Sequence, residues 1–192
     1  MIDVRRISGE AVKPYLADLA CLRIQVFREF PYLYEGDETY ESDYLTSYAD
    51  SARSVIVLAR DGAQVIGVST GLPLREADEA FRQPFVKAGI DVDRVFYLGE
   101  SVLLPAYRGQ GLGHRFFDER EAHASERGFA LTAFCAVQRP SDHPLRPADY
   151  RPHDVFWTKR GYVKRPELQV TLPWNQVDGR EVENVLTFWT RG

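Results

Sequence analysis

Glycines alternate with other residues in one short segment of the chain, Arg108-Gly109-Gln110-Gly111-Leu112-Gly113. Pro105 ends the apolar run before this segment and a helical pattern follows it, so the glycines lie where a strand leads into a helix. The first N–H groups of a helix lack partners within it and carry the positive end of its dipole. Glycine lets the turn bend and lets phosphate oxygens approach the backbone. The segment therefore predicts an anion site.

Three phosphate-binding patterns compete for this segment. A Walker loop requires Lys-Ser or Lys-Thr after its last glycine, and the sequence has neither here. A dinucleotide fingerprint requires glycine or alanine three residues after its second glycine, where His114 stands. The pattern Arg/Gln-x-x-Gly-x-Gly/Ala is satisfied by Arg108, Gly111 and Gly113. A tight strand–helix connection without a ligand is the alternative, but about two residues suffice for such a link.

The elements expected around this segment alternate between strands and helices. Apolar runs predict strands at residues 3–7, 54–60, 64–70, 95–104, 130–137, 162–172 and 182–190. Helical spacing predicts helices at 13–27, 38–48, 111–127 and 154–160. Residues 74–93 are expected to be a polar interlude and residues 138–152 a long loop rich in proline. We expect one mixed α/β domain over residues 1–192.

Composition and charge restrict the class of partner. The 192 residues are 44% hydrophobic, and 24 basic against 28 acidic side chains give a net charge of -4. This balance does not favour nucleic acid or an anionic membrane as a partner, so a small molecule is expected. The sequence contains no apolar stretch of signal-peptide or membrane-spanning length, so we expect a cytoplasmic protein. A homodimer is a candidate assembly.

Neither the cysteines nor the histidines indicate a further site. Cys21 and Cys135 lie far apart in the sequence and are expected to be reduced. Cys135 lies in the middle of an apolar strand, where a small core residue is expected rather than a nucleophile. We expect no metal, because four candidate ligands match no familiar spacing: His143, His153, Asp142 and Asp154.

With these residues in view, the chain resembles the GCN5-related N-acetyltransferase (GNAT) family. Its members carry Val-x-Pro-x-Tyr-Arg-Gly before the loop, and residues 103–109, Leu-Leu-Pro-Ala-Tyr-Arg-Gly, match it closely. They also carry Phe-Tyr-x-x-x-Gly-Phe further on, which residues 156–162 resemble. The resemblance implies a mostly antiparallel sheet flanked by helices, with splayed central strands. It also implies direct attack of a primary amine, expected to be that of a small metabolite, on acetyl-CoA.

Two other functions remain open at this stage. One is a non-catalytic domain that binds or senses acyl-CoA, and the other is acylation of a protein amine. For the cofactor, the resemblance implies backbone contacts from the strand before the loop and from the loop itself. The residues concerned are Val102, Leu103, Arg108, Gly109, Gln110, Gly111, Leu112 and Gly113.

Glu100 is the expected general base. It lies within an otherwise apolar strand, where burial would raise its pKa toward the range that suits a base. The alternative is that Glu100 pairs with an arginine in the sheet. Many relatives use a tyrosine as general acid where this chain has Trp157, which has no suitable proton. Tyr150 or Tyr162 could replace it, or the thiolate could leave unaided.

The acceptor site is expected between two loops. The resemblance implies that residues 30–41, rich in tyrosine and acidic residues, form part of it. Residues 138–144 could form the opposite wall, with an arginine available to a substrate carboxylate. The side chains expected to bind the acceptor are Tyr32, Tyr34, Glu35, Arg139 and His143.

Overall fold

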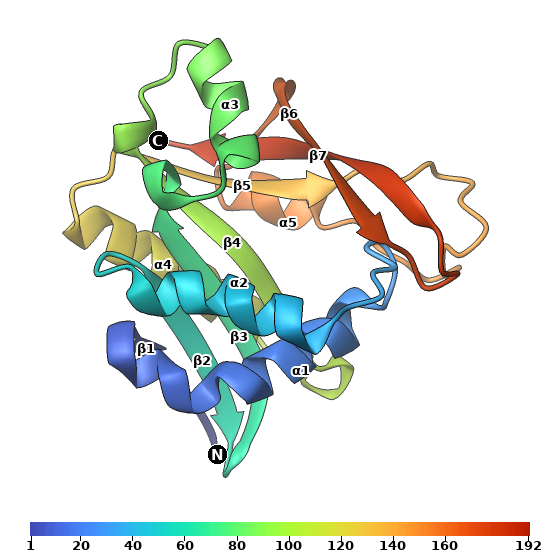
Figure 1. Ribbon diagram of the computed structural model, residues 1–192, viewed down its shortest axis with the longest axis horizontal. Coiled ribbons are helices and arrows are strands. Elements are labelled where there is room, and N and C mark those ends of the chain that lie inside the picture. Colours follow the sequence, from blue (N-terminus) through green and yellow to red (C-terminus); the bar gives the residue numbers. More distant parts are fainter.

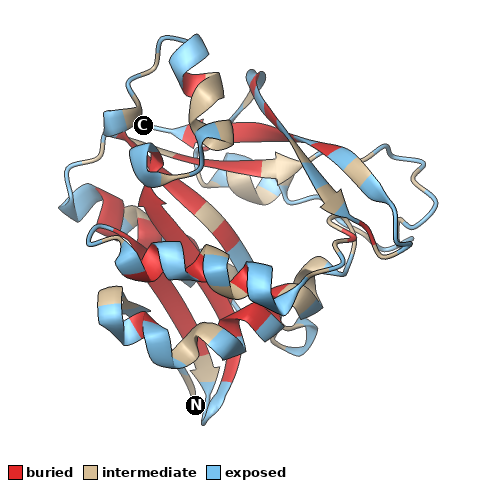
Figure 2. Ribbon diagram, in the orientation of Figure 1, coloured by how far each residue is buried: buried red, intermediate tan, exposed pale blue.

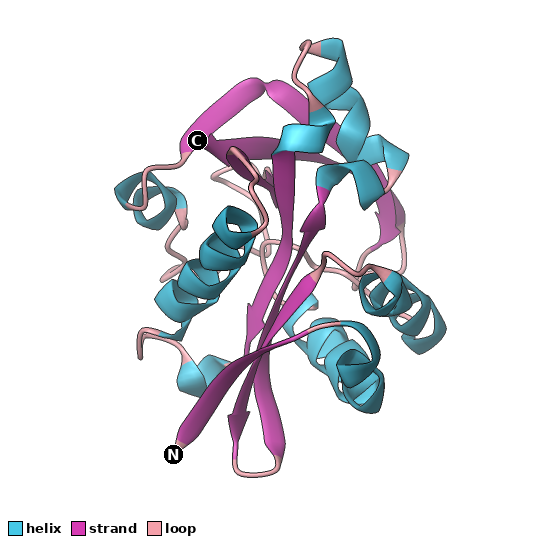
Figure 3. Ribbon diagram, turned by 90° about the vertical axis from the view of Figure 1, so that its left-hand side faces the viewer, coloured by secondary structure: helices cyan, strands magenta, loops and turns pink.

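The computed structural model describes residues 1–192 and contains one seven-stranded sheet with helices on both faces (Figures 1 and 3). The strands are β1 Ile2–Ile7, β2 Val55–Asp61, β3 Gln64–Pro73, β4 Val95–Leu103, β5 Leu131–Val137, β6 Val163–Asn175 and β7 Glu181–Arg191. The α-helices are α1 Leu16–Phe27, α2 Glu38–Asp50, α3 Glu79–Lys87, α4 Leu112–Glu126 and α5 Asp154–Lys159. None of the helices combines the length and apolarity that crossing a bilayer requires.

The strand order is β1-β2-β3-β4-β5-β7-β6, and every neighbouring pair is antiparallel except β4 and β5. That parallel pair is short. Its register runs from Val95 opposite Leu131 to Tyr97 opposite Ala133, although β4 continues to Leu103 and β5 to Val137. The two central strands therefore separate beyond Tyr97. The expected mixed α/β fold with splayed central strands is confirmed.

Two apolar cores lie on opposite faces of the sheet. Helices α1, α2 and α3 cover one face, where Leu19 and Tyr48 are buried with side chains of the central strands. Helices α4 and α5 cover the other, where Phe116 packs with residues such as Phe134. Burial is concentrated in the middle strands, as Figure 2 shows. The central strands therefore form a rigid support between two layers of helices.

The segment between β3 and β4 is more structured than the expected polar interlude. It contains helix α3, whose N-terminus is capped because the side chain of Asp78 accepts a hydrogen bond from the N–H of Ala80 at 2.8 Å. Phe85 anchors the helix in the core against Phe188, with ring centroids 4.9 Å apart. The helix has only nine residues and contains Pro84, a residue that usually ends a helix, so this stretch was not predicted to be helical.

Candidate active site

The backbone before and at the start of α4 presents a row of free N–H groups. None of the N–H groups of residues 109–114 donates to an acceptor of the protein. Gly109 and Gly111 adopt φ angles of 75° and 83°, in the left-handed region that favours glycine, and Gly111 is the N-cap of the helix. A Cβ added at Gly113 would meet no protein atom within 4 Å. The predicted anion site therefore has free donors and open space around it.

Side chains of the loop fasten it to the rest of the fold. Nε of Arg108 donates to the carbonyl of Leu103 at 3.1 Å, and its Nη1 lies 2.9 Å from a carboxylate oxygen of Glu29. Gln110 donates to the carbonyl of Ala106 at 3.1 Å. Leu112 is buried in the core beneath α4. The side chains of this predicted cofactor-binding segment thus hold its shape, and its backbone N–H groups have no acceptor in the protein.

The splayed part of β4 lies directly before this loop. Residues 98–103 of β4 have no partner on β5, so one edge of the strand is open along this stretch. Val102 is buried on the face covered by α1, and Leu103 packs into the core on the α4 face. The two predicted contact residues on the strand therefore fix β4 in place and leave its open edge free for backbone hydrogen bonds.

A β-bulge sets the direction of Glu100. Between the pairs Ser69–Ser101 and Gly71–Leu98, two residues of β4 stand opposite one residue of β3. The bulge shifts the alternation, so Glu100 lies on the same face as Tyr97, beside α1 and α2. Strict alternation would have directed Glu100 toward α4. Gly99 is required in the bulge, because a Cβ there would lie 2.4 Å from the hydroxyl of Tyr48.

Glu100 belongs to a buried cluster of charges. Nη1 of Arg23 on α1 lies 2.6 Å from Oε1 of Glu100, and Nε of Arg23 donates to Glu41 on α2. All three side chains are buried, and two carboxylates share one guanidinium. Burial alone would lower the pKa of Arg23, but Glu100, Tyr44 and Glu41 outweigh burial and raise that pKa well above its usual range. Glu100 thus pairs with an arginine, which comes from a helix and not from the sheet.

Two tyrosines of α2 connect to this cluster. The hydroxyl of Tyr44 donates to Oε2 of Glu100 at 3.1 Å, and the hydroxyls of Tyr44 and Tyr48 are 2.8 Å apart. Burial raises the pKa of both phenols, with Glu100 adding to the effect. These residues were missed in the sequence. The spacing of Glu41, Tyr44 and Tyr48 on one face of a helix was the signal that could have indicated them.

A second buried arginine supports the bulge from the opposite face. Nη1 of Arg120 on α4 donates to the carbonyls of Thr70 and Glu100, each at 3.1 Å, and its Nη2 donates to Ser101 at 2.8 Å. Burial lowers the pKa of Arg120 to about 10. Arg120 therefore satisfies the carbonyls that the irregular pairing leaves without strand partners.

The predicted acceptor residues divide into two groups. Tyr32 lies near the charged cluster, and burial raises its pKa, with Cys135 and Glu100 contributing. Arg139 donates to the carbonyls of Pro31 and Tyr32 at 2.7 and 3.0 Å, so it joins the two loops.

The other three predicted acceptor residues make structural contacts. Tyr34 forms a β-bridge with Gln176, and burial raises the pKa of its hydroxyl, with Glu41 of the charged cluster contributing. Glu35 is exposed and bonded to Arg28, and His143 packs on Phe30 with its Nδ1 accepting from the N–H of Leu145.

The candidates for general acid also differ in their surroundings. Trp157 packs between Phe134 and Trp189. Tyr162 is buried and donates to Glu121 at 3.1 Å, on the α4 face of the sheet. Tyr150 packs edge-on against Phe30, in the long loop. Cys135 is buried, and burial raises its pKa to about 12, so its thiol is protonated at neutral pH.

Comparison with known proteins identifies the class. The sequence model described as "Acetyltransferase (GNAT) family" matches residues 22–147 of the 192. The chain therefore belongs to the GNAT family and is an acyltransferase. A comparison with curated proteins finds no match.

Solved structures share the fold over nearly the whole chain. The ribosomal-protein-alanine N-acetyltransferase from Brucella melitensis is 15% identical, with a TM-score of 0.64 and 98% of each chain covered. A GNAT-family acetyltransferase from Streptococcus pneumoniae is 16% identical, with a TM-score of 0.62, and 100% of this chain and 99% of that chain are covered. An N-acetyltransferase from Staphylococcus aureus Mu50 is 12% identical, with a TM-score of 0.62 and 98% of each chain covered. At these identities the likeness establishes the fold.

Proposed function

We propose that this protein transfers the acetyl group of acetyl-CoA to the primary amine of a small molecule by direct attack. The observation that carries the proposal is the row of free N–H groups at residues 109–114, placed beside the open edge of β4. Amides at a helix N-terminus bind the phosphates of a nucleotide, and an open strand edge pairs with an extended chain that contains amide groups. Coenzyme A has both parts.

Each part of the splayed site has a separate task in this proposal. The amides of residues 109–114 hold the diphosphate, and the backbone of residues 101–103 pairs with the pantetheine arm. A backbone N–H of this stretch also polarises the thioester carbonyl and stabilises the developing oxyanion. Glu100 takes the proton that the ammonium group of the acceptor must lose before it attacks.

The leaving thiolate needs no dedicated acid. The thiol of coenzyme A resembles free cysteine, whose pKa is about 8.5, so the thiolate is an adequate leaving group near neutral pH. Trp157 offers no acidic proton, and Tyr162 is held by Glu121 on the other face of the sheet. Participation of Tyr150 stays a prediction, as do acceptor contacts from the other loop residues. A cytoplasmic location and a homodimer also stay predictions.

Titration calorimetry with acetyl-CoA, followed by a thiol-release assay against a panel of primary amines, tests this function. We expect saturable binding of acetyl-CoA and release of free thiol that depends on both the amine and the protein. Binding without release for any amine would favour an acyl-CoA-binding domain instead. Absence of acetyl-CoA binding would exclude both functions.

A further inference from the structure

A cavity of about 520 Å³ lies between α2 and α3, on the face of the sheet that carries Glu100. Four aromatic side chains form much of its wall: Tyr44, Tyr48, Phe81 and Tyr97. Phe81 and Tyr97 pack against each other with ring centroids 5.1 Å apart. Helix α3 supplies the outer wall, so the segment between β3 and β4 creates this cavity. A flat apolar group fits such a wall.

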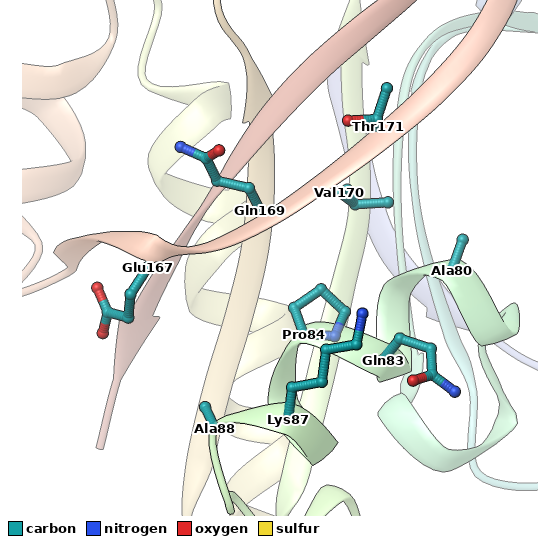
Figure 4. A pocket seen from close by; sticks show the side chains of 9 residues that line it. All are labelled: Ala80, Gln83, Pro84, Lys87, Ala88, Glu167, Gln169, Val170 and Thr171. Carbon is teal, nitrogen blue, oxygen red and sulfur yellow. The ribbon is translucent and has the colours of Figure 1, made fainter.

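A second cavity, of about 580 Å³, borders the opposite side of α3 and lacks these features. It lies between α3 and β6, and its lining includes Lys87 and Glu167 (Figure 4). None of its nine lining residues belongs to the charged cluster, the loop before α4 or the splayed strands β4 and β5. Of these two cavities, the one between α2 and α3 is therefore the one that reaches the candidate active site.

Hydroxyl groups connect this cavity to the base. Tyr44 donates to Glu100 at 3.1 Å, which leaves the hydroxyl proton of Tyr48 to donate to the oxygen of Tyr44 at 2.8 Å. Both tyrosines line the cavity. These hydrogen bonds form a chain from Tyr48 through Tyr44 to Glu100, in which each hydroxyl donates toward the carboxylate. The oxygen of Tyr48 is the far end of this hydrogen-bond chain, where the hydroxyl of Thr70 is its other neighbour, and it can accept a proton from a bound cation.

The hydroxyl of Tyr48 lies where the two central strands part. The hydroxyl of Tyr48 lies 2.4 Å from the position that a Cβ on Gly99 would take. Gly99 is two residues beyond Tyr97, the last residue of β4 that pairs with β5. A group bound at Tyr48 is therefore adjacent to the opening between the strands, where the thioester would lie.

Hydrogen bonds and aromatic contacts close the side of the site that the two predicted acceptor loops border. Arg139 binds the carbonyls of Pro31 and Tyr32, and the indole N–H of Trp174 donates to Tyr32 at 3.2 Å. Phe30 packs on Tyr150 with ring centroids 4.7 Å apart. These contacts join three segments over the side where the sequence predicted the acceptor to bind.

The charge of the lining selects the class of ligand. Three carboxylates and one guanidinium border the cavity, which gives a net charge of -2: Glu76, Asp78, Glu79 and Arg82. The three carboxylates are exposed near the mouth and attract a cation. Beyond the tyrosines, Glu100 is the carboxylate nearest the cavity, and it shares Arg23 with Glu41. A ligand with a positive charge and an aromatic body matches both properties.

We propose that the cavity between α2 and α3 binds the acyl acceptor, a primary amine with an aromatic body, and that Tyr48 and Tyr44 relay its proton to Glu100. This inference rests on the proposed function. The ammonium group gives one proton to the oxygen of Tyr48, Tyr48 gives its own to Tyr44, and Tyr44 gives its own to Glu100. The neutral amine then attacks the thioester carbonyl. When the C–S bond breaks, the second nitrogen proton goes to the thiolate, and Glu100 later releases its proton to water.

The relay requires tyrosines that stay protonated. Burial raises the pKa of Tyr44 and of Tyr48, so each passes a proton on and neither acts as the base. The charged and titratable groups around this hydrogen-bond chain are Arg23 from α1, Glu41 from α2, Tyr97 and Glu100 from β4, Tyr32 from the loop after α1 and Arg120 from α4.

Two tryptophan variants of α2 test the cavity, with phenethylamine as the acceptor probe. Ser47 lines the cavity and Thr46 does not, although both are exposed neighbours that bond to carbonyls of the same helix. We expect S47W to raise the KM for phenethylamine by about tenfold or more by narrowing the cavity, and to leave the KM for acetyl-CoA unchanged. We expect T46W to change neither. An unchanged KM for phenethylamine in S47W would overturn the proposed cavity.

Two tyrosine variants test the relay. We expect Y48F to lower kcat by about a hundredfold with little change in either KM, because it removes the proton-accepting oxygen and keeps the ring. T46V, which removes an exposed hydroxyl of the same helix, should match the wild type. Normal kcat in Y48F would overturn the relay. A wild type that binds acetyl-CoA and acetylates other amines but not phenethylamine would overturn the aromatic class, whereas failure to bind acetyl-CoA would refute the proposed function itself.

Discussion

The guanidinium of Arg23 lies 2.6 Å from the carboxylate of Glu100, and it reaches that position from α1 across the bulge in β4. A carboxylate so close to one unshared arginine would make a poor base, because the arginine stabilises the ionised form of the carboxylate. The arginine is shared with Glu41, which is completely buried. The cluster thus offsets the charge of Arg23 and leaves one net negative charge beside the opening between β4 and β5.

Substitution of Glu100 tests its role as the base. We expect E100Q to lower kcat for amine acetylation by about a hundredfold, because the amide keeps the shape of the side chain but cannot take a proton. Acetyl-CoA binding, measured by calorimetry, should stay within about twofold of the wild type because the amides of residues 109–114 are unchanged. E183Q, an exposed glutamate of β7, is the control. Equal turnover in E100Q at every pH would remove Glu100 as the base.

Substitutions of the glycines at the start of α4 distinguish an effect on acetyl-CoA binding from an effect on stability. Gly113 has an ordinary helical backbone and open space around it, so G113V should fold and yet weaken acetyl-CoA binding by about tenfold or more through its bulk. Gly111 has a φ of 83°, so G111A should also cost about 1 kcal/mol of unfolding free energy. Calorimetry and urea unfolding measure the two effects. Undiminished binding in G113V would show that the cofactor lies elsewhere.

Arg120 should matter for stability. R120M removes the donors for two buried carbonyls and the hydroxyl of Ser101, which we expect to cost about 3 kcal/mol in urea unfolding. R115M, an exposed arginine of the same helix, should change the free energy of unfolding by less than about 0.5 kcal/mol. Similar values for the two variants would show that the bulge does not depend on Arg120.

The sequence was sufficient for the fold class and the loop because both depend on local patterns. Apolar runs located all seven strands, and the alternate glycines before α4 marked the row of free amides. Helix α3 was missed because it has only nine residues and contains Pro84, which indicated a break rather than a helix.

The surroundings of Glu100 could not be predicted, because they depend on contacts between distant segments. Residues 23, 41 and 100 meet only when α1 and α2 pack over β4. The bulge also moves Glu100 to the opposite face from the one that alternation indicates. Glu100 was identified as a carboxylate in an apolar strand, but neither its arginine nor its tyrosines could be read from that pattern.

The two cysteines should differ in reactivity. Cys21 is exposed, whereas Cys135 is buried and burial raises its pKa to about 12. At pH 8, we expect iodoacetamide to modify only Cys21 of the folded protein, because alkylation needs an accessible thiolate. Mass spectrometry should find one adduct in the wild type and none in C21S. Rapid modification of Cys135 would contradict its placement in the core, and urea-unfolded protein, which should take up two adducts, is the control.

His123 should make stability fall in mild acid. Its side chain is buried against the carbonyl of Arg53, and burial lowers its pKa below the ordinary value of 6.5. As the pH falls through 6.5, the unfolded chain takes up a proton at this residue before the folded chain does, and this uptake favours unfolding. Urea unfolding of the wild type should therefore lose more free energy between pH 7.5 and pH 5 than that of H123Q, which cannot bind this proton. Parallel pH dependence in the two proteins would mean that His123 ionises equally well in the folded and unfolded states.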